Sequence, residues 1–395
     1  MKKLIIYSVL TLAIASNLFS QWEPANNGLT ADLVKKFAII NNNIYAGTDN
    51  GLFFSTDNGN SWTKTKNLPE KGVWAFALTG KNFFVGTVDG IFLSTDNGNT
   101  WTSKNNGLTT KNIWSLIIIE DKIFAGTAGG GVFISENNGD SWSSKNNGLK
   151  ATHINALDVS GNNIYAGTWG NGVFISNDKA NTWIEKNNGL TSLFVQTLTV
   201  NGNNIFVGTF DKGVFLSTDN GNSWTNKNDG LSHPCVTTIE KAGNIIFVGM
   251  NGGGICISTN NGNTWIEKNS GLTTKEVMSL VIKGEYVFAG TYQKGIFRAK
   301  LSDFGITNVQ EEFSNQTANR LISPNPASDY IEINYHNFTQ KEAKEIKTYN
   351  AFGECVMTVG AIHELPQKRI DISHLPAGVN FVRFGNFTET FVVSR

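Results

Sequence analysis

Short apolar segments alternate with Asn- and Gly-rich turns along most of the chain. One unit illustrates the pattern, with apolar or alternating runs at 114–119, 123–127, 131–135 and about 142–145. Runs of this length, bounded by turn-forming residues, are typical of β-strands. The pattern therefore predicts units of four short strands.

These units repeat at a nearly constant period. An octapeptide, first seen from Ser55 to Trp62, occurs six times, and its tryptophans are spaced by 39, 41, 41, 41 and 41 residues. A second marker, an apolar residue followed by Gly-Thr or once by Gly-Met, occurs seven times between Gly47 and Gly290. Four strands in each of seven such units predict a seven-bladed β-propeller over residues 21–302.

The two markers differ in number because the seventh unit is split. This unit ends near Leu301 and lacks the segment that carries the tryptophan elsewhere. A matching segment, Trp22 to Leu29, occurs at the N-terminal side of the first unit and resembles Trp101 to Leu108. A closed ring whose last blade takes its outer strand from the start of the chain explains this offset. An open β-solenoid, the alternative, does not.

The first 20 residues have the pattern of a secretory signal peptide. Lys2 and Lys3 precede an apolar run at 4–15, which is too short to span a membrane. We expect cleavage before Gln21, with Ala13-x-Ala15 as a competing site and a buried N-terminal strand as the alternative interpretation. No second run is long enough to span a bilayer, so we expect no membrane-spanning segment.

The octapeptide, Ser-x-Asp-x-Gly-x-Thr/Ser-Trp, resembles the Asp box of BNR-type repeats. An Asp or Asn side chain can bond backbone N–H groups of a turn, Gly permits positive φ, and Trp packs between sheets. Gly is replaced by Ala180 in the fourth unit, where the turn is expected to differ. We expect a structural role for the box residues, which are Asp57, Trp62, Asp96, Trp101, Asn137, Trp142, Asp178, Trp183, Asp219, Trp224, Asn260 and Trp265.

Families that share this box include sialidases, xyloglucan-hydrolysing glycosidases, sortilin-type receptors and photosystem assembly factors. Sialidases use three arginines for the substrate carboxylate, whereas this propeller contains only Arg298. The glycosidases place two carboxylates in a cleft between two propellers, and here one ring is predicted. A glycoside hydrolase using Asp89 and Asp211 is the alternative function, although these residues are three blades apart.

Composition and the absence of known motifs narrow the classes of function that this chain can have. The chain has zero formal net charge and only 16% charged residues, which argues against nucleic-acid or anionic-membrane partners. No Ser-His-Asp order, zinc spacing or phosphate loop occurs, and the Glu that completes a calcium-binding EF-hand loop is missing. We therefore expect no cofactor and no metal, and binding rather than catalysis. Cys235 and Cys256 are expected on non-adjacent strands, too far apart for a disulfide.

The face opposite the octapeptides is the predicted ligand site. There the loops between the second and third strands meet the loops that lead into each first strand. Large aromatic and amide side chains occur at these positions in some repeats and small or polar ones in others. The candidate ligand-binding residues are Trp74, Trp114, Asn155, Trp169, Gln196, Phe210, Asp211 and Tyr292. They suit a sugar face or a peptide side chain, and the alternative is that they only pack at the channel mouth. We expect an extracellular glycan or protein as ligand, and a monomer.

The last 76 residues form a separate predicted domain. A polar linker at 303–319 is followed at 320–395 by short strands and turns, which predict a small β-sandwich. The motifs Pro324-Asn325-Pro326, Tyr349-Asn350-x-x-Gly353 and Leu375-x-x-Gly378, with a final strand, resemble the C-terminal sorting domain of type IX secretion in Bacteroidetes.

Two positions depart from that family. Asn380 stands where the family often has Tyr, and the chain ends in Ser394-Arg395 rather than a Lys-rich tail. The resemblance implies contact with the type IX machinery, export across the outer membrane, and release or surface anchoring after the domain is removed. An ordinary carbohydrate-binding sandwich is the alternative.

Overall fold

The computed structural model describes residues 21–40, 42–69 and 72–306, and parts of the C-terminal segment: 322–323, 330–334, 345–349, 355–360, 367–373, 375, 378–384 and 387–393. Residues 1–313 and 314–395 form two compact units. The expected signal peptide and most of the expected linker lie outside the described residues. No helix in the described ranges is long and apolar enough to cross a membrane.

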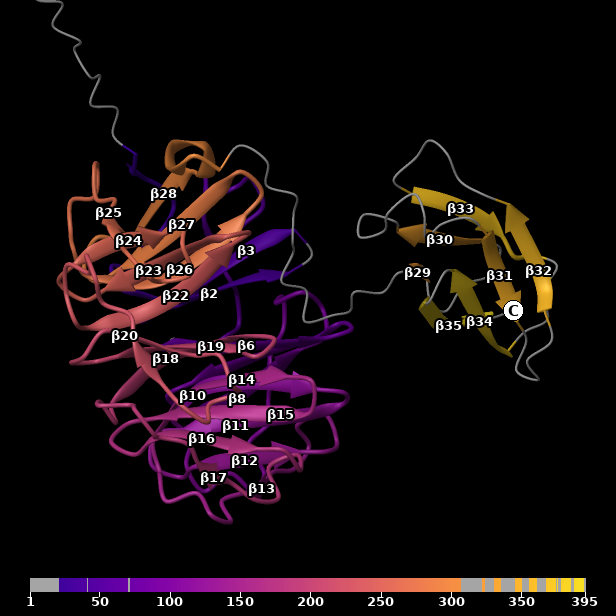
Figure 1. The fold of residues 1–395 in the computed structure, drawn as a ribbon, viewed down its shortest axis with the longest axis horizontal. Coiled ribbons are helices and arrows are strands. Elements are labelled where there is room, and N and C mark those ends of the chain that lie inside the picture. Colours follow the sequence, from indigo (N-terminus) through magenta and orange to yellow (C-terminus); the bar gives the residue numbers. More distant parts are fainter. Residues whose placement is uncertain are drawn as a thin grey trace, which may run out of the picture. The chain divides into compact units, whose positions relative to one another are not determined.

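The first unit contains seven four-stranded antiparallel sheets (Figure 1). This confirms the predicted seven-bladed β-propeller. From the first strand outward, the blades are β2 Val34–Ile40, β3 Asn43–Thr48, β4 Gly51–Ser55, β5 Thr63–Lys64; β6 Val73–Thr79, β7 Asn82–Thr87, β8 Gly90–Ser94, β9 Thr102–Ser103; β10 Ile113–Ile119, β11 Lys122–Thr127, β12 Val132–Ser135, β13 Ser143–Ser144; β14 Ile154–Ser160, β15 Asn163–Thr168, β16 Gly172–Ser176, β17 Ile184–Glu185; β18 Val195–Asn201, β19 Asn204–Thr209, β20 Val214–Ser217, β21 Thr225–Asn226; β22 Val236–Ala242, β23 Ile245–Met250, β24 Gly254–Ser258, β25 Ile266–Glu267; and β26 Val277–Lys283, β27 Tyr286–Thr291, β28 Ile296–Lys300, β1 Glu23–Pro24.

The seventh blade is completed by the N-terminal strand. β1 pairs with β28 so that Glu23 lies opposite Arg298. Trp22 beside it is fully buried, and its indole N–H donates to the Lys268 carbonyl at 2.8 Å. In Figure 1 the indigo strands of blade 1 lie beside the orange strands of blade 7, and β2 contacts β26. The ring therefore has no open sheet edge between its first and last blades.

A short helix after β28 packs on the seventh blade. A 3₁₀ helix, η1 (Leu301–Phe304), follows directly, and the ring of Phe304 lies 5.8 Å from that of Trp22 and 5.3 Å from that of Phe247. Phe304 and Ile306, which fall in the range expected to be linker, therefore pack against the core of the propeller.

Adjacent blades are joined by the octapeptide tryptophans. Trp142, for example, packs with Phe84 and Phe133 of neighbouring sheets, and its N–H donates to the Lys104 carbonyl at 2.8 Å. The same bond recurs at Trp183, Trp224 and Trp265. Trp101 lacks it, and its buried N–H has no partner among the described residues.

The Asp or Asn side chain of each octapeptide holds a tight turn. Oδ1 of Asp57 accepts hydrogen bonds from the Ser55 hydroxyl and the Ser61 N–H, and Oδ2 accepts from the Ser61 hydroxyl at 2.6 Å. Asn137 makes the equivalent bonds to Ser141. Ala180 adopts the same left-handed turn as the glycines, with φ of 65° and its N–H bonded to Ser176. The turn of the fourth unit is therefore retained, contrary to expectation, at a steric cost of about 1–2 kcal/mol.

Asp57→Ala is expected to lower the free energy of unfolding by about 1–2 kcal/mol at neutral pH, because the turn loses three hydrogen bonds. Hydrogen bonds from Ser61 lower the pKa of Asp57, so its contribution is present above the ordinary Asp pKa and is lost as pH falls through the lowered value. Chemical denaturation at several pH values measures this. Asp57→Asn is the matched control and should retain most of the stability, since Asn137 forms the same turn. Equal losses in both variants would contradict this account.

The C-terminal unit is also all-β. Its described strands form a three-stranded antiparallel sheet of β29 Ile322–Ser323, β30 Tyr330–Asn334 and β33 Gln367–Asp371, and a four-stranded sheet of β32 Cys355–Gly360, β31 Glu345–Tyr349, β34 Gly378–Phe384 and β35 Phe387–Val393. The motifs at 324–326 and 350–353 lie outside the described residues. The all-β class predicted for the whole chain is confirmed for its described part.

Candidate functional site

The loops opposite the octapeptides are hydrogen-bonded to one another from blade 3 round to blade 1. The N–H groups of Gly170, between β15 and β16, and of Gly172, the first residue of β16, both donate to the Leu193 carbonyl in the loop that leads to blade 5. Similar contacts join blade 3 to 4, blade 5 to 6, blade 6 to 7 and blade 7 to 1, where the Gly295 N–H donates to the Asp32 carbonyl at 3.0 Å. Side chains on these loops are therefore held by a fixed backbone.

A β-bulge occurs at the start of every first strand. The pairing register shifts at the second residue of each, and the first strands of neighbouring blades contact one another around the central channel. Bulges turn a side chain out of the regular alternation. The seven bulged residues are partly buried: Lys35, Trp74, Trp114, Asn155, Gln196, Thr237 and Met278.

Contacts within the propeller explain the positions of several of these seven bulged side chains. The Lys35 ammonium lies 4.8 Å from the ring centre of Trp74, and burial lowers the pKa of Lys35. The Nδ2 group of Asn155 donates to the Val195 carbonyl of the next blade at 2.8 Å. The ring of Trp114 lies 6.1 Å from that of His153. Trp74, Trp114 and Asn155 therefore have contacts within the propeller.

A different set of aromatic side chains is exposed on blades 4 and 5. The ring of Trp169 lies 5.2 Å from both Phe194 and Phe210, at an interplanar angle of 65° in each pair. Trp169 is 38% exposed, Phe194 39%, Phe210 46% and the adjoining Leu193 39%. These four residues are called the aromatic cluster below. The structure thus unites two predicted residues, Trp169 and Phe210, with two that the sequence analysis missed.

Backbone and side-chain bonds fix the cluster. The Phe210 N–H donates to the Phe194 carbonyl at 2.9 Å. The hydroxyl of buried Ser192 accepts from the Phe194 N–H and donates to Oδ1 of Asp211. The predicted residue Asp211 is therefore tied to the edge of the aromatic cluster.

Besides Trp114 of blade 3, two predicted residues lie outside blades 4 and 5. Trp74 belongs to blade 2, and Tyr292, 41% exposed, belongs to the loop after β27 in blade 7. No ring contact of Tyr292 is found among the described residues. The next residue, Gln293, has a φ of 67°, which is uncommon for a non-glycine residue.

Charged residues that the sequence analysis missed face the channel. Lys36, Asp158 and Glu240 come from the first strands of blades 1, 4 and 6. Both Asp158 oxygens accept backbone N–H bonds, from Val159 and Val200 at 2.8 Å, yet burial raises the pKa of Asp158 to about 6. Burial raises the pKa of Glu240 to about 7, the positive charge of Lys36 opposes this rise, and the charge of Asp158 adds to it. The sequence signal that could have indicated these channel-facing residues is a charged side chain within an otherwise apolar or Thr-rich first strand.

Glu240→Gln is expected to stabilise the protein at pH 8 by about 1–3 kcal/mol and to have little effect near pH 4. The folded pKa of Glu240 lies above its unfolded value, so the stability present below about pH 4.3 is lost as pH rises through 7. Denaturation midpoints at the two pH values measure the difference. Glu267→Gln is the control, because exposed Glu267 has a lowered pKa through Asn269 and Lys275. A Glu240→Gln variant no more stable than wild type at pH 8 would refute the buried-charge interpretation.

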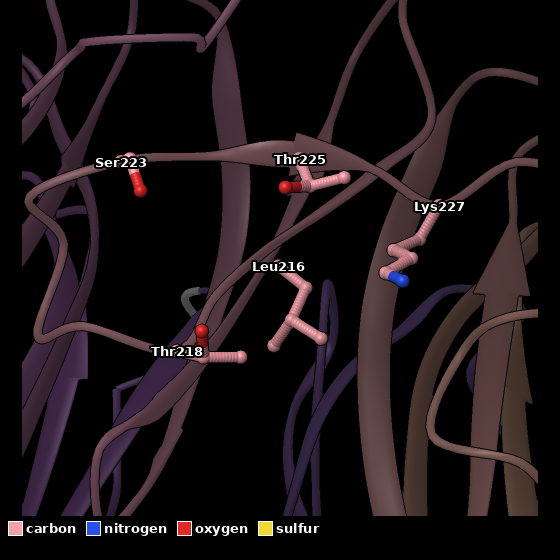
Figure 2. Close-up of a pocket in the computed structure, with 5 residues that line it drawn as sticks. All are labelled: Leu216, Thr218, Ser223, Thr225 and Lys227. Atoms are coloured by element: carbon pink, nitrogen blue, oxygen red, sulfur yellow. The ribbon is translucent and has the colours of Figure 1, made fainter.

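A pocket of about 230 Å³ lies at the opposite, octapeptide end of blade 5. Figure 2 shows Leu216 and Thr218 on one segment facing Ser223 and Thr225 on the neighbouring one, with Lys227 beyond. The Lys227 ammonium donates to Asn263, and Lys186 and Lys145 make the same bond in other blades. The lysine contact beside the pocket is therefore a feature of the repeat. Among the described residues, no group of three or more His, Cys, Asp or Glu side chains could hold a metal.

The tail identifies the export route. Residues 321–394 match the family of secretion system C-terminal sorting domains. The protein is exported by type IX secretion to the cell surface or the medium, as predicted. The tail therefore contacts the secretion machinery. The sequence has no significant match among curated proteins.

Solved structures share the propeller fold at low identity. The extracellular domain of the putative one-component system BT4673 from B. thetaiotaomicron is 18% identical, with a TM-score of 0.61 over 71% of this chain and 40% of that one. PorZ of Porphyromonas gingivalis, described as an essential surface component of the type IX secretion system, is 15% identical, with a TM-score of 0.57 over 93% and 60%. The GH74 enzyme of Niastella koreensis is 18% identical, with a TM-score of 0.53 over 68% and 43%. This chain spans about 40% of the first of these. They show the fold alone.

Proposed function

We propose that this protein is a non-catalytic binding protein outside the cell, and that a glycan or protein ligand contacts the loop face at the aromatic cluster. The observation that carries this proposal is the cluster itself: three aromatic rings and Leu193, each more than a third exposed on a fixed backbone. Contiguous exposed apolar patches of this kind mark interaction sites. A rigid site also loses little conformational entropy on binding.

The wider site includes residues next to the cluster. Asp211 is bonded to Ser192 at the edge of the cluster, and Gln196 and Asn155 are the bulged second residues of the first strands of blades 5 and 4. Trp114 lies in blade 3, and its ring is next to that of His153. We include Trp114 in the wider site for this reason. Trp74 and Tyr292, on blades 2 and 7, are assigned no contact with this ligand.

A glycoside hydrolase is the second candidate, because the GH74 enzyme shows that this type of propeller supports catalysis. Two-carboxylate hydrolysis needs carboxyl groups within roughly 10 Å of each other. The proposed pair, Asp89 and Asp211, lies in blades 2 and 5, and Asp211 is already bonded to Ser192. These positions favour binding over hydrolysis.

Two further assignments follow from the sequence resemblance. We assign the octapeptide turns to the Asp-box type, supported by the shared Asp or Asn bonds and interblade tryptophans. We also infer that residues 1–20 are a removed signal peptide, since type IX export begins with passage across the inner membrane.

The proposal is tested by screening the full chain against glycan and peptide arrays and then incubating each hit with the protein. The expected result is a bound ligand that is recovered unchanged. Release of a smaller saccharide from a hit would show that the protein is a glycoside hydrolase.

A further inference from the structure

We propose that the aromatic cluster and Asp211 bind an arginine side chain of a partner protein. This inference rests on the proposed function, because it names the ligand class of the same site. The ligand chemistry is a flat organic cation with an apolar stem, and the source to which we commit is a protein segment.

The ring geometry suits a cation. Phe194 and Phe210 are each inclined by 65° to Trp169, so the three rings do not form one flat platform. The faces of aromatic rings carry partial negative charge and attract cations within about 6 Å. Arginine stacks on such faces through its planar guanidinium group. Leu193 offers apolar surface for the methylene stem.

Asp211 supplies a fixed negative charge beside the rings. Ser192, which is 3% exposed, donates to Oδ1 of Asp211 and accepts from the backbone of Phe194, so the carboxylate and the cluster share one anchor. No ion pair of Asp211 occurs among the described residues, although Lys212 follows it in the chain. The pKa of the Cys235 thiol in the next blade is raised mainly by burial, and the negative charge of Asp211 adds to this rise. The carboxylate is therefore available to a partner's cation.

A neutral glycan fits these groups less well. Sugar hydroxyls need hydrogen-bonding partners when they leave water. Near the cluster, the Asn155 Nδ2 group is bonded to Val195, its Oδ1 atom is buried, and the Ser192 hydroxyl is bonded to Asp211. An arginine needs only the ring faces and the carboxylate, with which it forms charge-assisted bonds.

The test uses the full chain and synthetic peptides that differ only at one central residue: Arg, Lys, Gln or Leu. A neutral glycan array is probed in parallel. The Arg peptide is expected to bind at least tenfold more tightly than the Gln and Leu peptides, and more weakly at high salt. Asp211→Asn keeps an acceptor for the Ser192 hydroxyl but removes the negative charge. This variant is expected to bind the Arg peptide at least tenfold more weakly than wild type. Phe210→Ala should have a similar effect.

Two matched variants control for loop position. Asp49→Asn changes an exposed carboxylate of the equivalent loop in blade 1, and Tyr292→Ala removes an exposed ring at the position of Phe210 in blade 7. Both are expected to bind like wild type. If the Arg peptide does not bind, or if a glycan or uncharged peptide binds through Trp169 without regard to Asp211, the arginine inference is overturned while the proposed function stands. If all binding is unchanged by Trp169→Ala, the proposed function fails as well.

Discussion

Trp22→Ala is expected to lower the free energy of unfolding by about 3–5 kcal/mol, the usual cost of removing a buried tryptophan. Trp22 is fully buried with Phe247, Phe297 and Phe304 between the last two blades, and its N–H bonds to blade 6. Deletion of residues 22–29 is expected to cost more, because β28 then loses its partner strand and becomes an exposed edge. Thermal or chemical denaturation of the propeller measures both effects.

Glu23→Ala is the control for this closure. It removes an exposed side chain and its ion pair with Arg298 but leaves the backbone pairing with β28 intact. Exposed ion pairs contribute about 0–1 kcal/mol, so the change should be small. An unchanged melting temperature after deletion of residues 22–29 would refute the closed ring.

Truncation after residue 320 is expected to abolish appearance of the protein outside the cell. Residues 321–394 match a secretion sorting domain and belong to a compact unit separate from that of the propeller. Fractionation of a type IX-competent cell measures the distribution, and the truncated protein should remain in the periplasm with an unchanged melting temperature of its propeller. The matched test is residues 320–395 fused to a periplasmic reporter, which should be exported. Extracellular truncated protein would contradict the routing.

The propeller could be predicted from the sequence because every blade packs against its neighbour with the same types of residue at the same positions. The recurring tryptophans fill equivalent spaces between sheets, so the period in the sequence reports the period in space. The split seventh unit gave a further signal, since only a closed ring places Trp22 next to β28. Ala180 was misjudged because its neighbours impose the turn on a residue that disfavours it.

Only part of the candidate site could be predicted from the sequence. Trp169 and Phe210 stand out in aligned loops, but Phe194 lies just before a first strand, and its contact with Trp169 depends on how two loops cross. The channel charges were missed for another reason. The bulge at each first strand shifts the alternation of inward and outward side chains, so Asp158 and Glu240 cannot be assigned to the channel from sequence alone.

The most direct test of the binding account is the affinity and the melting temperature of Trp169→Ala and Trp114→Ala, measured on one ligand from the array screen. We predict that each substitution weakens binding by about 1–3 kcal/mol, the scale of an aromatic contact at an interface, with little change in stability. Asp57→Ala, at the opposite end of the blades, should change only stability. Normal affinity in both tryptophan variants, with stability losses of about 3–5 kcal/mol, would show that these residues only pack and that the loop face of blades 3 to 5 is not the ligand site.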